Sequence, residues 1–259
     1  MLGKMGHDRI NYQFDCKAGA FLDIFLFIII ILIASVLQTS TGFGFSIVAT
    51  PFLLLIFEVT EAIQINLILS LLISSALIVK IRSDIDFDIL KRLILGSIVG
   101  IPIGIIILLA IDTESLKLII SLIILVLTFM LIRSFQVKQT AGRDLVFGGL
   151  SGSLTTSIGM PGPPLLLYFS GANLKKEKLR GTTLAFYLFI YAVSLLSQLI
   201  FIGTERIVWV SSGLAIPIVL LGLYLGQLLF SRINQKTFRV FTYVILLFTG
   251  IYLLIDSLT

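Results

Sequence analysis

The chain has 259 residues, of which 58% are hydrophobic and only 13% are charged, and its formal net charge at pH 7 is +5. Because soluble domains carry roughly a quarter charged residues, this composition leaves too little polar surface for a soluble globule. The single cysteine and the single histidine exclude an intramolecular disulfide and a metal cluster built from these residues, so no metal or cofactor is expected.

Apolar segments recur along the chain after a polar N-terminal tail over residues 1–19. Many are long enough for helices that cross a hydrocarbon core of about 30 Å, which takes about 20 residues. No small-residue cleavage site follows the first apolar run, so this run is predicted to be a span and not a signal peptide. The sequence therefore predicts an all-α polytopic membrane protein.

Ten segments divide into two halves, residues 20–134 and 144–256, joined by a polar linker over residues 135–143. The segments of the first half are expected over residues 21–40, 43–57, 62–81, 90–111 and 115–133. Those of the second half are expected over residues 144–157, 163–172, 181–202, 207–230 and 238–255. The second, sixth and seventh segments are short for full spans.

Two stretches rich in glycine or proline interrupt this pattern. The first is QTSTGFGFS, residues 38–46, and the second is TTSIGMPGPPLLLYF, residues 155–169, which packs two glycines and three prolines into six residues. Helix interiors tolerate neither residue type cheaply, and a membrane tolerates broken backbone only where the freed groups find other partners. Broken or re-entrant helices are therefore expected at equivalent places in the two halves.

The two halves also resemble each other when one is shifted along the chain. A shift of 122 positions places Gly100-Ile-Pro-Ile-Gly104 on Gly222-Leu-Tyr-Leu-Gly226, and a shift of 112 places residues 51–57 on residues 163–169. One GxxxG pair alone usually marks a close helix contact. The same spacing twice, with further matches, indicates a duplication into two repeats of about five segments each.

The distribution of lysine and arginine predicts how these repeats sit in the membrane. Fourteen of the 19 basic residues fall in loops on one face, and five fall on the other. The basic face of a membrane protein is normally cytoplasmic, so both termini are expected outside the cytoplasm, in a cell membrane. With five segments per half, the second repeat is inverted relative to the first. Inverted repeats with broken helices are typical of secondary transporters, whose substrate site lies near the midplane.

An interrupted helix can bind an anion without a basic side chain. Its new N-terminus leaves up to four backbone N–H groups free and carries about half a positive charge from the helix dipole. Glycines allow close approach of the backbone, and prolines in the first helical turn lose no hydrogen bond. The candidate substrate-binding residues are Gln38, Thr41, Gly42, Gly44, Ser46, Asn66, Thr156, Ser157, Gly159, Gly162, Arg180 and Tyr187.

Several of these residues have a second interpretation, which the sequence leaves open. Single serines and threonines near the breaks can instead cap the backbone or allow close packing. Arg180 is placed at the cytoplasmic mouth, where it attracts the anion or simply marks topology. Polar stripes at helical spacing line a pathway or form interhelical hydrogen bonds. These stripes are Asn66, Ser70 and Ser74 in the third segment, and Tyr187, Tyr191, Ser194 and Gln198 in the eighth.

Acidic residues are expected near segment ends, with none in the middle of a segment. A proton or Na⁺ relay usually has a buried carboxylate, so coupling through a midplane acid is not expected. No nucleophile–base pair, metalloprotease motif or nucleotide-binding loop occurs, and the protein is not expected to be an enzyme.

The motifs at the two breaks carry a family resemblance. They are Gly42-Phe-Gly44 followed by Pro51, and the run GMPGPPLLLY over residues 159–168, with Arg180-Gly181-Thr182 further along. In these motifs, and over residues 21–255 as a whole, the chain resembles the TauE/SafE family of membrane anion transporters. Phe45, Ser46 and Pro161 stand where that family often has glycines. The resemblance implies sulfur oxyanions and sulfonates as substrates, for example sulfite, thiosulfate or sulfoacetate.

The sequence thus predicts a secondary transporter, acting as an exporter, that binds a small sulfur-containing anion at facing helix breaks and works by alternating access. A passive anion channel and a non-transporting membrane scaffold or assembly protein are the alternatives. The expected partners are the small anion and the lipid bilayer, with a homo-oligomer left open. Nucleic acid is not expected, because topology explains the basic residues.

Overall fold

The computed structural model describes residues 24–133, 137–170, 172, 174–230 and, with interruptions, 243–255. The predicted tail over residues 1–19 and the start of the predicted tenth segment lie outside the described residues. Within the described ranges the regular elements are helices, and no strand occurs.

The helices follow the predicted segments closely. In chain order they are the first helix Ile24–Thr41, α2 Phe45–Leu53, α3 Val59–Ile81, the 3₁₀ turn η1 Arg82–Asp84, α4 Phe87–Ala110, α5 Thr113–Ile132, α6 Ala141–Ile158, α7 Gly162–Ser170, α8 Lys176–Phe201 and α9 Arg206–Leu229. Helical residues also occur between 243 and 255. In the described part of the chain, five helices are long and apolar enough to cross a membrane: the first helix, α3 with η1, α4, α8 and α9. The prediction of an all-α polytopic membrane protein is confirmed.

Two predicted boundaries differ from the structure by four residues or more. Helix α2 ends at Leu53, four residues before the predicted end of the segment at residue 57. Glu58 and Glu61 form the capping box that starts α3, so the residues between Leu53 and Glu58 form the turn between the two helices. Helix α8 begins at Lys176, before the predicted start at Gly181. The polar stretch that was expected to be a loop consists of Lys, Glu, Leu and Arg, which are strong helix formers.

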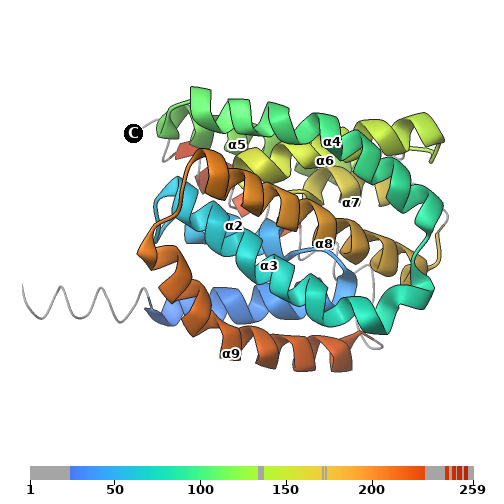
Figure 1. Ribbon diagram of the computed structural model, residues 1–259, viewed down its shortest axis with the longest axis horizontal. Helices are drawn as coiled ribbons and strands as arrows, with labels where there is room; N and C mark the ends of the chain where they lie inside the picture. The colour runs from blue at the N-terminus through green and yellow to red at the C-terminus, as the bar shows by residue number, and fades with distance from the viewer. Residues whose placement is uncertain are drawn as a thin grey trace, which may run out of the picture.

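The long helices lie side by side in Figure 1, so their termini define two ends of one bundle. At one end α3 and α9 finish and α4, α6 and α8 begin. Lys80 Nζ donates to Gln227 Oε1 there at 2.5 Å, and Lys176 Nζ donates to the Phe230 carbonyl oxygen at 2.6 Å. We call this the basic end, and the other the opposite end.

The two broken helices form hairpins that enter the bundle from different ends. The first helix starts beside the beginning of α3, where the rings of Phe27 and Phe57 are 5.7 Å apart, and α2 returns to that opposite end. Helix α6 starts at the basic end and α7 returns to it, since Tyr168 of α7 contacts Thr140 and Asp144. At 1.5 Å per residue, the nine-residue helices α2 and α7 are each about 14 Å long. They are half-helices that re-enter the bundle.

Glycines allow α4 to lie directly against α6. A Cβ built on Gly100 would be 2.0 Å from the carbonyl oxygen of Gly149, and one built on Gly104 would be 2.5 Å from that of Ser153. These distances are too short for any side chain. The two backbones therefore touch, as in the close helix contacts of other membrane proteins.

Helix α9 contacts the first helix in the same way. A Cβ on Gly222 would be 3.3 Å from the carbonyl oxygen of Leu32, and one on Gly226 would be 2.8 Å from that of Val36. The GxxxG pairs that a shift of 122 aligns thus serve the same packing contact in both halves. The carbonyl groups that they contact are related by a shift of 117: Leu32 and Val36 on the first helix correspond to Gly149 and Ser153 on α6.

The shift of 112 that aligns residues 51–57 with residues 163–169 does not join equivalent places in the fold. Pro51 is the seventh residue of α2, whereas Pro163 is the second residue of α7. The two half-helices begin 117 positions apart, the same offset that relates the helices before them. The proline match therefore reflects similar composition and not a shared position.

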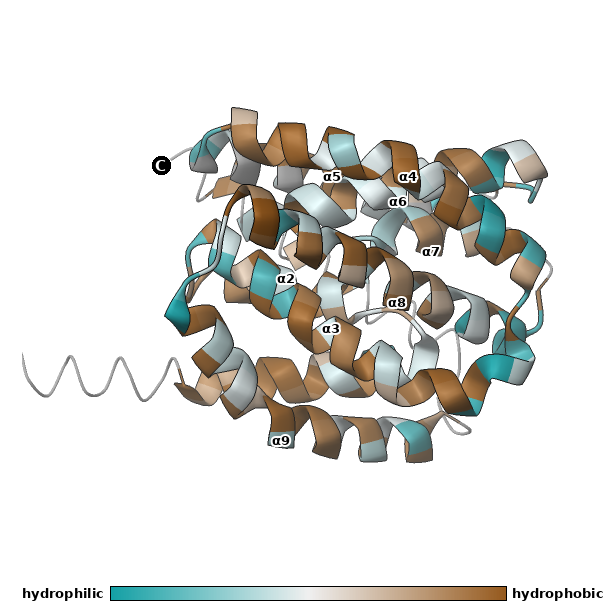
Figure 2. Cartoon of the chain, viewed as in Figure 1, coloured by the Kyte–Doolittle hydropathy of each residue, from teal (hydrophilic) through white to brown (hydrophobic). Residues whose placement is uncertain are grey.

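The outside of the bundle is apolar and the inside holds polar groups. Figure 2 shows brown, hydrophobic ribbon along the lengths of the outer helices and teal residues mainly toward the two ends. Val79 and Ile200 are 73% and 75% exposed, while Gln38 and Asn66 are fully buried. An extended surface of exposed aliphatic side chains is unfavourable in water, and amide side chains such as those of Gln38 and Asn66 are costly when they face lipid. This distribution is that of a protein surrounded by lipid.

Replacing Gly100 by alanine is expected to destabilise the protein, because the new methyl group would meet the Gly149 carbonyl oxygen of α6 at 2.0 Å. Overpacking of this kind costs roughly 1–3 kcal/mol. Gly213 of α9 is a matched control, since a Cβ there meets no atom within 4 Å, and Gly213→Ala should add about 0.5–1 kcal/mol of stability. Thermal unfolding in detergent measures both, and equal midpoints would contradict the α4–α6 contact.

Candidate anion-binding site

Glycines in the left-handed backbone region end both broken helices. Gly42 and Gly44, with φ of 83° and 115°, separate the first helix from α2, and Gly159, with φ of 71°, ends α6. The Gly42 N–H donates to the Gln38 carbonyl oxygen at 2.9 Å, and the Gly159 N–H donates to that of Thr155 at 2.9 Å. Side chains rarely adopt these angles without strain, so the turns themselves require glycine.

The turn that opens α2 lies close to the turn that opens α7. A Cβ built on Gly162 would be 2.9 Å from Ile47 Cδ1 and 3.3 Å from the Tyr187 hydroxyl oxygen. The Phe43 ring lies edge-on to Phe169 at 6.4 Å and to Tyr187 at 6.2 Å, between ring centroids. Two helix N-termini and the middle of α8 therefore meet in one place.

The first turn of α2 presents free backbone donors there. Its N-cap, Gly44, makes no side-chain cap bond, and the first N–H to bond back to it is that of Val48, at 3.0 Å. The N–H groups of residues 45–47 thus have no acceptor within the helix. Helix α7 contributes fewer donors, because two prolines in its first turn carry no N–H.

Four hydroxyl groups gather at this meeting point, and we call them the hydroxyl cluster: Ser46, Thr50, Tyr187 and Tyr191. Ser46 and Thr50 are one turn apart on α2, and the rings of Tyr187 and Tyr191 are 5.1 Å apart on α8. The hydroxyls of Ser46 and Ser70 both lie near that of Tyr191, but beyond hydrogen-bonding distance. Each residue is at most 1% exposed, and none of the four oxygens has a hydrogen-bond partner among the described residues. An unpaired buried hydroxyl costs roughly 1–3 kcal/mol, so these four groups are available to bind a ligand or buried water.

Three other predicted hydroxyl groups bond within their own helices. Thr41 and Ser157 each donate to a carbonyl oxygen one turn earlier at 2.7 Å, and Thr156 does so at 3.0 Å. Thr156 also lies 2.8 Å from the Ser194 hydroxyl. The backbone-capping interpretation describes these contacts, and direct binding of substrate by these three residues stays a prediction.

The predicted amide side chains hold the broken helices in place. Asn66 Nδ2 donates to the Gly159 carbonyl oxygen at 2.7 Å, at the very end of α6. Gln38 Nε2 donates to the Ser74 hydroxyl at 3.2 Å and to the Ser70 carbonyl oxygen at 3.3 Å. Both amides therefore connect a break to α3, whose polar stripe forms interhelical contacts.

Arg180 lies inside the bundle and not in an exposed loop. Its side chain is 8% exposed and donates from Nη2 to the Thr39 carbonyl oxygen at the end of the first helix. The guanidinium carbon is 4.2 Å from the centre of the Phe230 ring, and Nε has no partner among the described residues. A cation is favourable at a helix C-terminus, so Arg180 stabilises the first break while keeping one donor free.

A buried ion pair near the basic end is a feature that the sequence did not reveal. Asp144, in the first turn of α6, accepts from Arg92 Nε at 2.7 Å and from the Tyr168 hydroxyl at 2.6 Å, and is fully buried. Like the other acids it stands near a segment end, but three helices enclose it. In the sequence, only Tyr168 could have indicated the burial of Asp144, because its hydroxyl stands near the end of an otherwise apolar half-helix. The pair ties α7 to α4 and α6.

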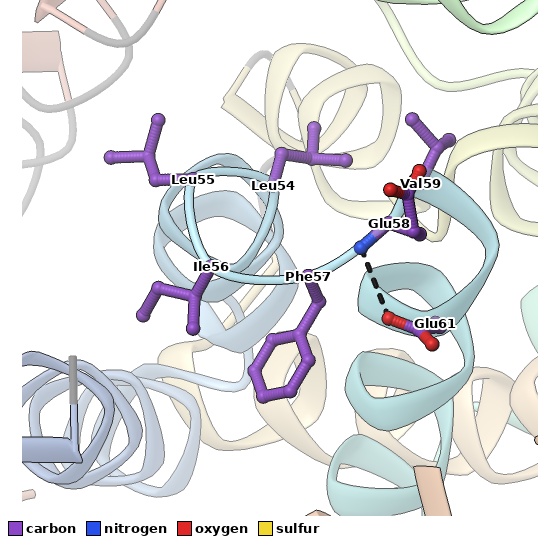
Figure 3. Close-up of a pocket in the computed structure, with 7 residues that line it drawn as sticks. All are labelled: Leu54, Leu55, Ile56, Phe57, Glu58, Val59 and Glu61. Carbon is purple, nitrogen blue, oxygen red and sulfur yellow. Dashed lines mark hydrogen bonds between the residues drawn. The ribbon is translucent and has the colours of Figure 1, made fainter. Parts of the chain in front are cut away.

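A surface pocket of about 340 Å³ lies beyond the far end of α2, and Figure 3 shows its lining. Residues 54–59 and Glu61 form it, and the Glu61 carboxylate accepts from the Glu58 N–H at 3.1 Å. None of the predicted site residues lines this pocket. Two carboxylates repel an anion, so the pocket is not a candidate for the anion site.

Comparison with known proteins identifies a protein family that matches this chain. Residues 27–253 match the family model of the sulfite exporter TauE/SafE. The matched range includes both breaks and every helix from α2 to α9. A search of curated proteins and a search of solved structures found no match.

Asp144→Ala is expected to loosen the α6–α7 hairpin, because it leaves Arg92 Nε without its acceptor and the Tyr168 hydroxyl with only the 3.3 Å bond to the Thr140 carbonyl oxygen. Breaking a buried ion pair costs roughly 3–5 kcal/mol. The Arg92 side chain is 33% exposed, which lowers the expected loss to roughly 2–3 kcal/mol. Exposed Asp88 in the first turn of α4 is the control, where Asp88→Ala should cost under about 1 kcal/mol. Denaturant unfolding in detergent measures the free energy of unfolding of both variants. Similar losses for Asp144→Ala and Asp88→Ala would disprove the role of Asp144.

Proposed function

The chain belongs to the sulfite exporter TauE/SafE family, and we propose that it is a secondary transporter that binds a small sulfur oxyanion between the opening turns of α2 and α7. Family membership indicates a membrane transporter or exporter of sulfite-like anions. The observation that carries the proposal is the meeting of two helix N-termini with four hydroxyls that have no partner in the described part of the chain.

The chemistry of this place suits an oxyanion. Helix N-termini bring partial positive charge, and the N–H groups of residues 45–47 point along the axis of α2 toward the break. The hydroxyl cluster adds donors from α8 on the other side. No acidic residue belongs to the cluster, so nothing there opposes negative charge. A sulfite ion presents three oxygens around one sulfur, and donors from two directions match that shape.

The walls of the site favour a small ligand. Phe43 lies edge-on to Tyr187, and a Cβ built on Gly162 would be 2.9 Å from the end of the Ile47 side chain. A glycine at this position lets the backbone approach the ligand directly. The proposed substrate is therefore sulfite or a compact organosulfonate, whose charged group enters the site while any organic part lies outside it.

The orientation in the membrane follows from charge. Fourteen of the 19 basic residues belong to the basic end under the ten-segment arrangement, which we assign to the cytoplasm, with both termini outside, in a cell membrane. The two hairpins enter from different ends and repeat the same glycine contacts. These features support two inverted repeats. Rocking of one half against the other would then expose the site to each side in turn.

Transport of radiolabelled sulfite into proteoliposomes tests the proposal. The unaltered protein should show saturable uptake and counterflow, as expected of a carrier, and thiosulfate and sulfoacetate should compete better than acetate. Unitary currents in planar bilayers would instead identify a channel. Absence of both transport and anion-dependent thermal stabilisation would favour a scaffold.

Changes at the breaks should abolish this activity in protein that still folds. Gly42→Leu combined with Gly159→Leu places side chains at φ of 83° and 71°, and normal sulfite transport by this variant would refute the proposed site. Gly162→Ala is the milder change, with an added Cβ 3.3 Å from the Tyr187 hydroxyl oxygen, and should reduce transport roughly tenfold or more. Gly142→Ala, where a Cβ meets nothing within 4 Å, should transport normally.

A further inference from the structure

We propose that the N-terminal half of α8 lines the route of the anion between the hydroxyl cluster and the basic end, with Arg180 as a binding subsite at its outer end. The inference rests on the proposed function, because it describes the access to the site proposed there. It assigns a role to Thr183, which the sequence did not single out, and gives Arg180 a position inside the protein.

One face of α8 carries an unpartnered polar atom at every turn from the cluster outward. Arg180, Thr183, Tyr187 and Tyr191 recur at intervals of three, four and four residues, which places them on one helical face. Each is at most 8% exposed, and Arg180 Nε, Thr183 Oγ1 and both tyrosine hydroxyls lack a partner among the described residues. The stripe is about 17 Å long at 1.5 Å per residue. Packing alone does not favour such a row, because every unpaired buried donor is costly.

The other half of the same face is used differently. The Ser194 hydroxyl lies 2.8 Å from that of Thr156, and Gln198 Nε2 donates to the Thr156 carbonyl oxygen at 2.8 Å. These side chains join α8 to α6. Gln198 Oε1 has no partner among the described residues, but it is an acceptor and repels an oxyanion. The donors therefore lead from the cluster toward the basic end only.

Arg180 ends this row with a full positive charge. The guanidinium donates to the Thr39 carbonyl oxygen, and the Arg180 backbone lies beside Gly42, where a Cβ would be 3.1 Å from Arg180 Cα. The Phe230 ring covers the guanidinium, and Lys176 Nζ lies over the same ring at 4.2 Å. An anion that moves along the row meets Arg180 Nε before it reaches the lysines of the basic end.

Among the described residues, the nearest neighbours of the second break are neutral. A Cβ on Gly159 would meet Asn66 Nδ2 at 2.9 Å and Ile63 at 3.3 Å, both neutral side chains. Gly42 and Gly159 hold the same place in their hairpins, 117 positions apart. The two breaks therefore have similar backbone conformations but different charges beside them. Only the first break has Arg180 next to it, on the side of the basic end.

Thr183→Val separates this proposal from a packing role. The substitution keeps the shape of the side chain and removes a hydroxyl that has no partner among the described residues, so a packing role predicts equal or greater stability and unchanged transport. We expect stability to be kept and the KM for sulfite to rise roughly tenfold in vesicles oriented with the basic end facing the added sulfite. Vesicles of the other orientation should show a smaller change.

Ser212→Ala is the matched control. Ser212 is 3% exposed and its hydroxyl also lacks a partner among the described residues, but it lies on α9, 14 residues before Gly226, the residue that contacts Thr39. That spacing places it about 21 Å along α9 from the first break. Its loss should leave the KM unchanged in both orientations.

Arg180→Gln extends the test to the outer subsite and should raise the KM more strongly from the basic side than from the other. If this variant does not fold, because the cap on Thr39 is lost, Thr183→Val still decides. Equal KM values for Thr183→Val, Ser212→Ala and the unaltered protein would overturn the route while leaving the central site intact. Absence of sulfite transport by the unaltered protein would overturn the proposed function and the route together.

Discussion

The rest of this structure depends on one constraint: backbone N–H and C=O groups that a helix break frees inside a hydrocarbon layer must find other hydrogen-bond partners. At both breaks the carbonyl side is satisfied by a side chain, Asn66 for Gly159 and Arg180 for Thr39. The N–H side of α2 keeps its donors, because Gly44 makes no side-chain cap bond. In the proposed site, this difference between the two sides is what allows the interrupted helix to bind an anion.

The broken helices need rigid support, and direct contact between backbones provides it. Gly100 and Gly104 bring α4 onto α6, and Gly222 and Gly226 bring α9 onto the first helix. Each hairpin is thus held by a long helix of the other half and also by a polar contact within its own half, from Gln38 to Ser74 and from Gln198 to Thr156.

The sequence revealed the backbone features of the site better than its side chains. Clustered glycines and prolines in apolar segments have few explanations other than a broken helix, so both breaks were predictable. The role of a hydroxyl depends on what packs against it. Ser157 bonds to its own helix, whereas Ser46 and Thr50 do not, and no local pattern separates them. The burial of Asp144 likewise arises from α4 and α7, which are distant in sequence.

The central claim is that the anion lies between the opening turns of α2 and α7. A crystal structure of the protein grown in selenite, which has the shape and charge of sulfite and an anomalous signal from selenium, tests it directly. The account predicts a selenium peak beside Gly162 with its oxygens within hydrogen-bonding distance of the hydroxyls of Ser46 and Tyr187. A peak confined to the lysines and arginines of the basic end, with none between the two half-helices, would contradict it.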